Sequence, residues 1–116
     1  MNENLNLMNS YKYHPTTKEE LQKLIEQRIK EEGNEVDLND IDISNITDMY
    51  GLLLGFDKFN GNISKWDVSN VTNMSWMFSG CENFNGDISG WNVSKVIDMD
   101  DIFYLCPIED RYKPKF

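Results

Sequence analysis

Apolar side chains recur along the second half of the chain at a fixed interval. Trp66 and Trp91, like Cys81 and Cys106, are separated by 25 positions. The other matched pairs are Ile63 and Ile88, Val68 and Val93, Ser69 and Ser94, Val71 and Val96, Met74 and Met99, and Phe78 and Phe103. A weaker copy precedes them at Ile41, Ile43, Ser44, Ile46, Met49, Leu53 and Phe56. Repeats of about 20–50 residues form arrays in which each unit covers the apolar face of its neighbour. The pattern therefore predicts a stack of about three repeats.

Each repeat has two parts that differ in periodicity. Residues 66–69, Trp-Asp-Val-Ser, alternate apolar and polar side chains, which is typical of a strand with one buried face. Val71, Met74, Met77 and Phe78 then follow at spacings of three and four, which is typical of a helical turn. We therefore predict an α/β fold, a solenoid of about three 25-residue strand-helix coils. Parallel stacking would place Ile41, Trp66 and Trp91 in one ladder, and Ile43, Val68 and Val93 in another.

An amphipathic segment precedes the repeats. Thr17 and Glu20 have the Thr-x-x-Glu spacing of a capping box, and Gly33 suits a helix C-terminus. One face of the helix between them carries Leu21, Leu24, Ile25, Arg28 and Ile29. We expect this helix to cover the apolar end of the first repeat. The chain then divides into a lead-in with a capping helix (1–34), the repeats (35–106) and a C-terminal tail (107–116).

The charge of the chain restricts its partners. Its 116 residues include 11 basic and 20 acidic side chains, a net charge of -9. Nucleic acids and anionic lipids are bound by cationic surfaces, so neither is expected as a direct partner. Between residues 31 and 57 the charged side chains are all acidic: Glu31, Glu32, Glu35, Asp37, Asp40, Asp42, Asp48 and Asp57. This stretch is either a solvated face or a surface for a basic protein.

Few residues have the character of a reaction centre. His14 is the single histidine and stands beside Pro15, which favours a loop position over a general base. Cys81 and Cys106 share a repeat position with Phe56, so we expect buried, reduced thiols that are close enough for oxidation. The sequence has no zinc-ligand spacing, no phosphate-binding glycine loop and no Gly-x-Ser-x-Gly. We predict a protein without enzymatic activity, cofactor or metal site.

Candidate binding residues depart from the logic of the repeat. Trp76 lies off the apolar stripe, and its equivalents are Gly51 and Asp101. It is either an anchor for a partner or a surface residue that packs on Tyr50 or Lys65. The partner-binding candidates are Trp76, Tyr50, Asp37, Asp40, Asp42 and Asp67. Because Asp42, Asp67 and Asn92 recur with Ser44, Ser69 and Ser94, a structural hydrogen-bonding role is favoured for that ladder.

A family resemblance adds to these predictions. Residues 59–74, FNGNISKWDVSNVTNM, followed by Met77-Phe78-Ser79-Gly80-Cys81, resemble the bacterial BspA-type leucine-rich repeat, also called DUF285. The resemblance covers about residues 36–106 and implies a short right-handed leucine-rich-repeat solenoid. Members of this family are commonly surface or secreted proteins that bind host proteins. Residues 1–7 lack the basic start and apolar run of a signal peptide, so we expect a cytoplasmic protein.

These features predict a small acidic module for protein-protein interaction whose partner has a basic surface. One alternative is an inhibitor encoded by a phage or mobile element, whose acidic surface blocks the nucleic-acid site of a host defence enzyme. Another is a self-associating structural or adhesin-like repeat protein. No membrane partner is expected.

Overall fold

The computed structural model describes residues 11–116, which contain little regular secondary structure. The α-helix α2 spans Lys18–Glu32, and the 3₁₀ helix η1 spans Asp110–Tyr112. Pairing of extended backbone among these residues is limited to isolated parallel bridges: Tyr13 with Ile41, Asp37 with Asn62, Asp48 with Asn73, and Asn73 with Asp98. The prediction of an α/β leucine-rich-repeat solenoid built from strand-helix coils is therefore wrong. Within residues 11–116 the repeats contain no named strand and no α-helix.

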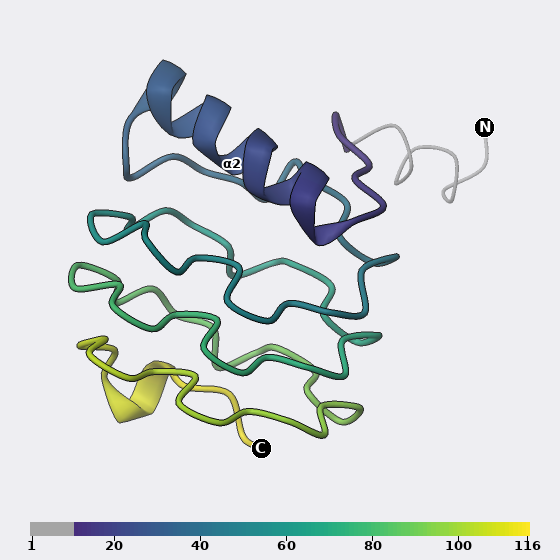
Figure 1. Ribbon diagram of the computed structural model, residues 1–116, viewed down its shortest axis with the longest axis vertical. Helices are drawn as coiled ribbons and strands as arrows, with labels where there is room; N and C mark the ends of the chain where they lie inside the picture. The colour runs from purple at the N-terminus through teal and green to yellow at the C-terminus, as the bar shows by residue number, and fades with distance from the viewer. Residues whose placement is uncertain (1–10) are drawn as a thin grey trace.

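The repeats nevertheless lie one above another as irregular layers (Figure 1). We call residues 36–60, 61–85 and 86–110 the first, second and third layers. Residues that are equivalent in the repeat touch across the layers, as the bridges from Asp48 to Asn73 and from Asn73 to Asp98 show. The indole rings of Trp66 and Trp91 stack with centroids 6.4 Å apart and planes 7° from parallel. The predicted ladder between these tryptophans is therefore confirmed.

Asp and Asn side chains turn the backbone three times in each layer. In such an Asx turn the side-chain oxygen accepts a hydrogen bond from the backbone N–H two residues on. In the second layer the acceptors are Asn62, Asp67 and Asn73, at intervals of five and six residues. The first and third layers repeat these bonds at Asp37, Asp42, Asp48, Asp87, Asn92 and Asp98. Turns this frequent leave no room for a regular strand or helix.

The turns explain both errors in the predicted secondary structure. The polar members of the Trp-Asp-Val-Ser pattern are turn residues, since Asp67 Oδ1 accepts from both the amide (3.1 Å) and the hydroxyl (2.5 Å) of Ser69. The structural role predicted for the Asp and Ser ladder is therefore confirmed. In the helix-like part, the N–H of Phe78 would bond the carbonyl of Met74 in an α-helix. It donates instead to the carbonyl of Ile102 in the third layer, at 2.9 Å.

Helix α2 begins and ends where the sequence predicts. Thr17 Oγ1 accepts from the Glu20 amide at 3.1 Å, and the Glu20 carboxylate accepts from the Thr16 amide at 3.1 Å. The helix ends at Gly33, whose φ of 92° suits glycine and whose N–H bonds the Ile29 carbonyl. Leu21 and Ile25 are fully buried against the repeats. The helix therefore covers the N-terminal end of the stack, as Figure 1 shows.

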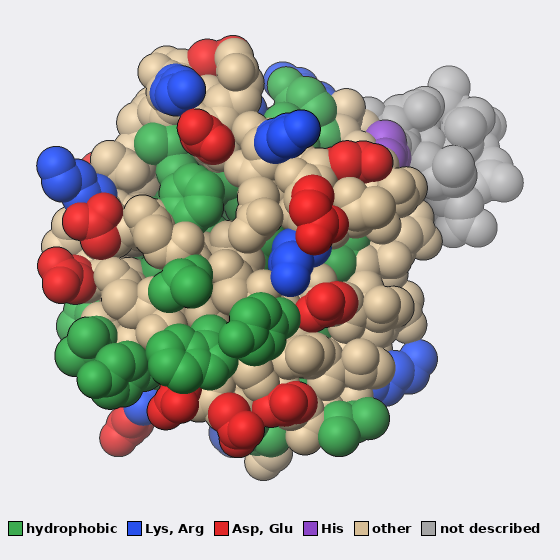
Figure 2. Space-filling model, viewed as in Figure 1, with side chains coloured by type: hydrophobic (Ala, Val, Ile, Leu, Met, Phe, Trp, Pro, Cys, Tyr) green, Lys and Arg blue, Asp and Glu red, His purple; other side chains and the backbone are tan. Residues whose placement is uncertain are grey.

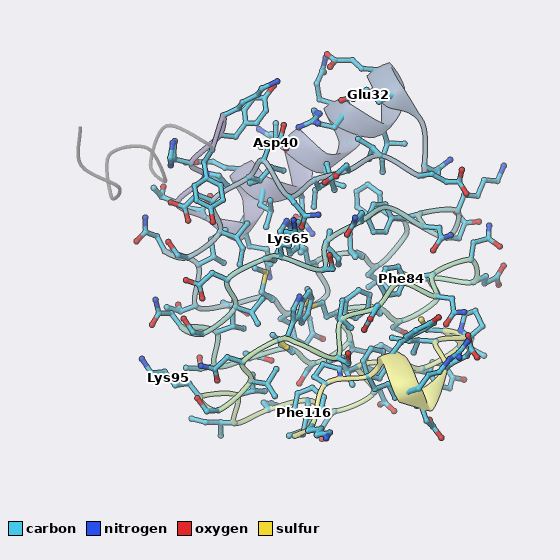
Figure 3. All side chains as sticks on the ribbon, turned by 180° about the vertical axis from the view of Figure 1, so that it is seen from behind. Glu32, Asp40, Lys65, Phe84, Lys95 and Phe116 are labelled. Carbon is cyan, nitrogen blue, oxygen red and sulfur yellow. The ribbon has the colours of Figure 1, made fainter. Side chains whose placement is uncertain are left out.

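Arg28 attaches α2 to the first layer. Its side chain is 8% exposed, and Nη1 donates to both oxygens of Asp40 at 2.9 and 3.0 Å. Nε donates to Glu32 at 2.6 Å, and Nη2 donates to the Asp37 carbonyl at 3.2 Å. Burial alone would lower the pKa of Arg28, but the hydrogen bonds that it donates to Asp40 and Glu32 outweigh burial and raise the pKa. Figure 3 shows Asp40 below the helix that carries Glu32.

The turns at Asn60-Gly61 and Asn85-Gly86, which recur at the same repeat position, depend on the packing around their glycines. A Cβ atom on Gly61 would lie 2.5 Å from the Phe59 ring and 2.5 Å from the Val36 carbonyl oxygen. A Cβ on Gly86 would lie 2.9 Å from the Phe84 ring. Both phenylalanines are fully buried, so they cannot move away from an added side chain. Glycine is therefore required at these turns by packing.

Replacement of Asp40 by Ala should loosen α2 because it leaves the buried guanidinium of Arg28 without its two-oxygen partner. The free energy of unfolding should fall by about 2–4 kcal/mol, between the values typical of exposed and of buried pairs. Urea denaturation followed by circular dichroism measures the change. Lys30→Ala is the control, since it removes the exposed Lys30–Glu26 pair (3.5 Å) and should cost at most about 0.5 kcal/mol. Equal effects of the two substitutions would contradict this role of Asp40.

Trp66→Ala should remove a large core side chain together with the hydrogen bond from Nε1 to the Leu38 carbonyl (3.0 Å). A truncation of this size costs about 3–5 kcal/mol. Trp91→Ala should behave alike, because its Nε1 bonds the equivalent Ile63 carbonyl at 3.1 Å. In thermal denaturation the control Ile97→Ala, at a side chain 84% exposed, should change stability by about 0.5 kcal/mol or less. A Trp66→Ala protein as stable as this control would exclude the stacked tryptophans as core.

Candidate functional site

Exposed hydrophobic side chains gather on one segment of each layer. We call the surface of residues 48–56, 73–81 and 98–106 the apolar face. Its most exposed large hydrophobic residues are Tyr50 (47%), Leu54 (53%), Tyr104 (53%) and Leu105 (64%). Figure 2 shows hydrophobic side chains as a band across the lower layers, with acidic side chains beside it. Such a patch with a polar rim is typical of a surface that binds protein.

The backbone explains why Trp76 lies off the apolar stripe. Its φ is 61°, in the left-handed region, and its equivalents Gly51 and Asp101 have φ of 60° and 53°. The repeat thus has a left-handed turn at this position, which directs the side chain away from the core. Trp76 is half-buried and meets the ring of Tyr104 edge to face, with centroids 6.1 Å apart. Its aromatic partner is therefore Tyr104, which the sequence did not indicate, and not Tyr50.

Leu105 occupies a second left-handed position. Its φ is 57°, and its equivalents are Gly55 and Gly80, with φ of 94° and 76°. Bulky residues rarely adopt this conformation, because Cβ crowds the following carbonyl oxygen. In the first and second layers glycine adopts this left-handed conformation without strain. The side chains of Trp76 and Leu105 therefore add exposed apolar surface at positions where they strain the backbone, which suggests a functional reason for them.

The predicted acidic candidates divide between internal and exposed roles. Asp40 binds Arg28. Asp42 accepts from the hydroxyl of Ser44 at 2.6 Å and from Nδ1 of His14 at 3.3 Å. Burial acts to raise the pKa of Asp42, but the hydrogen bonds from Ser44 and His14 outweigh it and lower the pKa. Asp40 and Asp42 therefore stabilise the fold.

The other predicted candidates are more open to a partner. Asp37 and Asp67 are exposed, although each also accepts a hydrogen bond in its own Asx turn. Tyr50 lies near the N-terminus of α2, where the ammonium of Lys18 is 5.5 Å from the centroid of the Tyr50 ring. Asp37 and Asp67 belong to layer segments outside the apolar face, whereas Tyr50 and Trp76 belong to it. The predicted site residues therefore lie on two surfaces.

Sequence reasoning missed three exposed residues of the apolar face, Leu54, Tyr104 and Leu105. The signal that singled out Trp76, a repeat position whose equivalents are not apolar, was present for Leu105 in the 25-residue frame. Leu105 stands where the earlier copies have Gly55 and Gly80. Tyr104 stands at the position of Leu54, and both side chains are 53% exposed. A comparison of every repeat position, and not only of the aromatic residues, would have included them.

Both cysteines are free thiols in apolar surroundings. Cys81 is fully buried, and its Sγ contacts the Leu53 carbonyl at 3.4 Å. Burial raises the pKa of Cys81 to about 12, with a smaller contribution from the neighbouring Cys106. Burial also raises the pKa of the half-buried Cys106. Neither thiol is therefore activated as a nucleophile at neutral pH.

Other sites for chemistry are sparse in residues 11–116. This part of the chain contains no group of three or more His, Cys, Asp or Glu residues that could hold a metal ion. A surface hollow is lined by the turns at Asn60-Gly61 and Asn85-Gly86. The side-chain oxygens of both asparagines already accept hydrogen bonds from the next layer. Asn60 Oδ1 accepts from the Asn85 amide at 3.1 Å, and Asn85 Oδ1 accepts from the Glu109 amide at 2.9 Å. Within the same range of residues, no helix has the length and apolar character needed to cross a membrane.

Comparison with known families identifies the chain. Residues 19–108 match the model of the family described as "Mycoplasma protein of unknown function, DUF285". The chain belongs to the DUF285 family. This confirms the family predicted from the repeat motif, while assignment to the BspA type stays a prediction. No curated protein and no solved structure matches the chain. Any function of this DUF285 member must therefore be argued from its own surface.

Leu105→Gly should stabilise the protein, because glycine adopts the left-handed φ without strain. Relief of the backbone strain contributes about 1–2 kcal/mol, and the conformational entropy of glycine costs about 0.5–1 kcal/mol. The free energy of unfolding should therefore rise by about 0.5–1 kcal/mol. Thermal denaturation should show a higher Tm. The control Leu54→Gly replaces a similarly exposed residue without a positive φ, so it should destabilise. A lower Tm for Leu105→Gly would show that the Leu105 side chain is needed for packing.

Proposed function

We propose that this DUF285 member is a non-enzymatic module for protein-protein interaction, and that it binds its partner through the apolar face. The observation that carries the proposal is the presence of two bulky apolar side chains at left-handed backbone positions: Trp76, whose equivalent in the first layer is Gly51, and Leu105, whose equivalents are Gly55 and Gly80. A bulky side chain strains the backbone at such a position, whereas its exposed apolar surface would benefit a partner. Aromatic residues in particular dominate the energetics of protein interfaces.

The geometry of Trp76 and Tyr104 suits an anchor. Their edge-to-face contact restrains both rings before a partner arrives. A restrained side chain loses less conformational freedom on binding than a mobile one, so more of the contact energy appears as affinity. Tyr104 also leaves about half of its surface free for a partner. These two rings are the proposed centre of the interface.

Acidic side chains beside the rings indicate the charge of the partner. Asp98, Asp100 and Asp101 are exposed in the third layer, and the whole chain has a net charge of -9. Complementary charge accelerates association and excludes partners of like charge. We therefore propose a partner with a basic surface around an apolar pocket or cleft.

A narrower proposal is an inhibitor, encoded by a phage or mobile element, that blocks the nucleic-acid site of a host defence enzyme. The exposed carboxylates of Asp37, Asp67 and Asp87 support it, because each of the three layers has one of them in a turn outside the apolar face. A nucleic-acid site is basic, so it would attract such a surface. In this version the acidic segments, and not the apolar face, would contribute most of the affinity.

Trp76→Gly and Tyr104→Ser should each weaken partner binding by about tenfold or more, because they remove the aromatic anchors. The partner is first captured from native lysate with the unmodified chain, and the purified pair is then titrated by calorimetry. Leu54→Ser is the matched comparison: it removes an equally exposed side chain of the apolar face, but from the first layer and away from the two rings, so it should weaken binding less than either anchor variant.

Melting curves separate lost affinity from lost folding, and Trp76→Gly should melt close to the unmodified chain. Unchanged affinity in both anchor variants would contradict binding through the apolar face. The double variant Asp37→Lys, Asp67→Lys tests the inhibitor version. A large loss of affinity in this double variant, without a loss in the anchor variants, would favour the inhibitor. Affinity should fall with added salt in either version.

A further inference from the structure

Seven hydrogen bonds between layers on the apolar face run in one direction. The backbone N–H of each layer donates to a carbonyl of the next layer, at every second residue. From the first to the second layer the pairs are Met49 to Asn73, Gly51 to Ser75 and Leu53 to Met77, at 2.8–3.0 Å. From the second to the third they are Met74 to Asp98, Trp76 to Asp100, Phe78 to Ile102 and Gly80 to Tyr104, at 2.8–3.0 Å. The layers therefore have a donor side and an acceptor side.

The third layer ends this series with donors alone. Its equivalents of the donating residues are Met99, Asp101, Phe103 and Leu105, whose N–H groups we call the donor edge. No residue between 11 and 116 accepts a hydrogen bond from any of these four groups. The carbonyls between them already accept from the second layer. An unpaired row of backbone groups is a template for another chain.

The side chains at this end are also less covered than those of the second layer. Met74, Phe78 and Cys81 are fully buried, whereas their equivalents Met99, Phe103 and Cys106 are only partly buried. Ile97 and Leu105 are 84% and 64% exposed. The last layer therefore presents apolar surface together with its free donors.

The C-terminal tail completes a different segment of this layer. The N–H of Ile88 donates to the Tyr112 carbonyl at 3.0 Å, so the tail replaces a further layer there. Lys113 lies over the ring of Phe103, 5.5 Å from its centroid. Figure 1 shows η1 and the tail at this end of the stack. The tail pairs with one segment of the third layer and leaves the donor edge open.

We propose that the donor edge binds a segment of another protein, which adds to the stack as a further layer on the apolar face. Backbone carbonyls at alternate residues of that segment accept from the donor edge, as Asp98 to Tyr104 accept from the second layer. Addition of a segment to an open edge is a common mode of peptide recognition. The inference rests on the proposed function and specifies where and how the partner binds.

A second copy of this chain does not fit the donor edge. Two copies joined through their C-terminal ends would oppose N–H to N–H. If the C-terminal end of one copy met the N-terminal end of another, the acceptors for the donor edge would be first-layer carbonyls. These are the carbonyls of Asp48, Tyr50, Leu52 and Leu54, which form the acceptor side. Helix α2 covers that side, and Gln22 Nε2 already donates to the Leu52 carbonyl at 3.2 Å. The occupant is therefore a different chain.

Charge and spacing define the chemistry of that chain. Asp98, Asp100 and Asp101 flank the donor edge and would repel an anion, so basic side chains are favoured beside the carbonyls. The exposed Ile97 and Leu105 favour aliphatic or aromatic side chains in the same segment. The bound segment is thus an extended or turn-rich peptide with mixed basic and apolar character.

A displayed library of random peptides, selected on the unmodified chain, tests the proposal without a known partner. Enriched peptides are synthesised and titrated into the isotopically labelled chain while amide hydrogen exchange is followed by NMR. Exchange at Met99, Asp101, Phe103 and Leu105 should slow by about tenfold or more, and the peptides should be rich in Lys, Arg and apolar residues. The amides of Met74 and Phe78 should change little, since they are already bonded.

Tyr104→Ser and Leu54→Ser form the matched pair of variants for the peptide titration. Both residues are 53% exposed at equivalent positions, but only Tyr104 is in the third layer. Peptide affinity should fall by a larger factor in Tyr104→Ser than in Leu54→Ser, because Leu54 lies two layers from the donor edge, and melting curves test whether both variants fold.

Three results would overturn the inference. They are protection of amides outside the donor edge, no enrichment of peptides over background, and donor-edge protection in the free chain with a dimer mass in sedimentation. If a lysate partner needs Trp76 and Tyr104 but protects no donor-edge amide, the proposed function stands and this inference fails. If both anchor variants bind the partner normally while peptides protect the donor-edge amides, the proposed function fails and this inference stands.

Discussion

The structure depends on hydrogen bonds between residues that occupy the same position in neighbouring layers. Three Asp or Asn side chains in each layer bond the backbone of their own turns, as Asp67 does with Ser69. The backbone is then too strongly bent to form strands or helices, so its remaining N–H and C=O groups find partners one layer away. Identical side chains consequently stack on one another, and Trp66 on Trp91 is the clearest case. A layer isolated from its neighbours would leave these backbone groups without partners.

The same constraint gives the stack two unlike ends. At the N-terminal end α2 covers the first layer, with Leu21 and Ile25 in the core and Arg28 bound to Asp40. At the C-terminal end the tail pairs with Ile88 but leaves the N–H groups of the donor edge without an acceptor among residues 11–116. A fold held by bonds between layers must have free groups wherever the series stops. The exposed ring of Tyr104 and the unpaired donors therefore both lie in the last layer of the stack.

The sequence was sufficient for some elements and insufficient for others. The limits of α2 were predictable because its capping box and terminal glycine are local signals that need no distant partner. The strands and helical turns were wrongly predicted because Asx turns also alternate polar and apolar residues, and successive turns also space apolar residues by three or four. At Phe78 the choice between a helical bond to Met74 and a bond to Ile102 depends on a residue 24 positions away. At the candidate site, Trp76 was recognised as exceptional, whereas its contact with Tyr104 joins two layers and has no local signal.

The sequence alone was enough to specify which side chains face the core. Similar apolar residues recur at the same positions of each repeat, and these residues pack on one another. The sequence did not place the Asx turns, because their alternation of polar and apolar residues is shared with strands. The direction of the hydrogen bonds between layers, the internal use of Asp40 and Asp42, and the left-handed backbone at Trp76 and Leu105 emerged from tertiary structure alone. Each of these features depends on which surface lies opposite, and that is settled only when the layers and α2 are assembled.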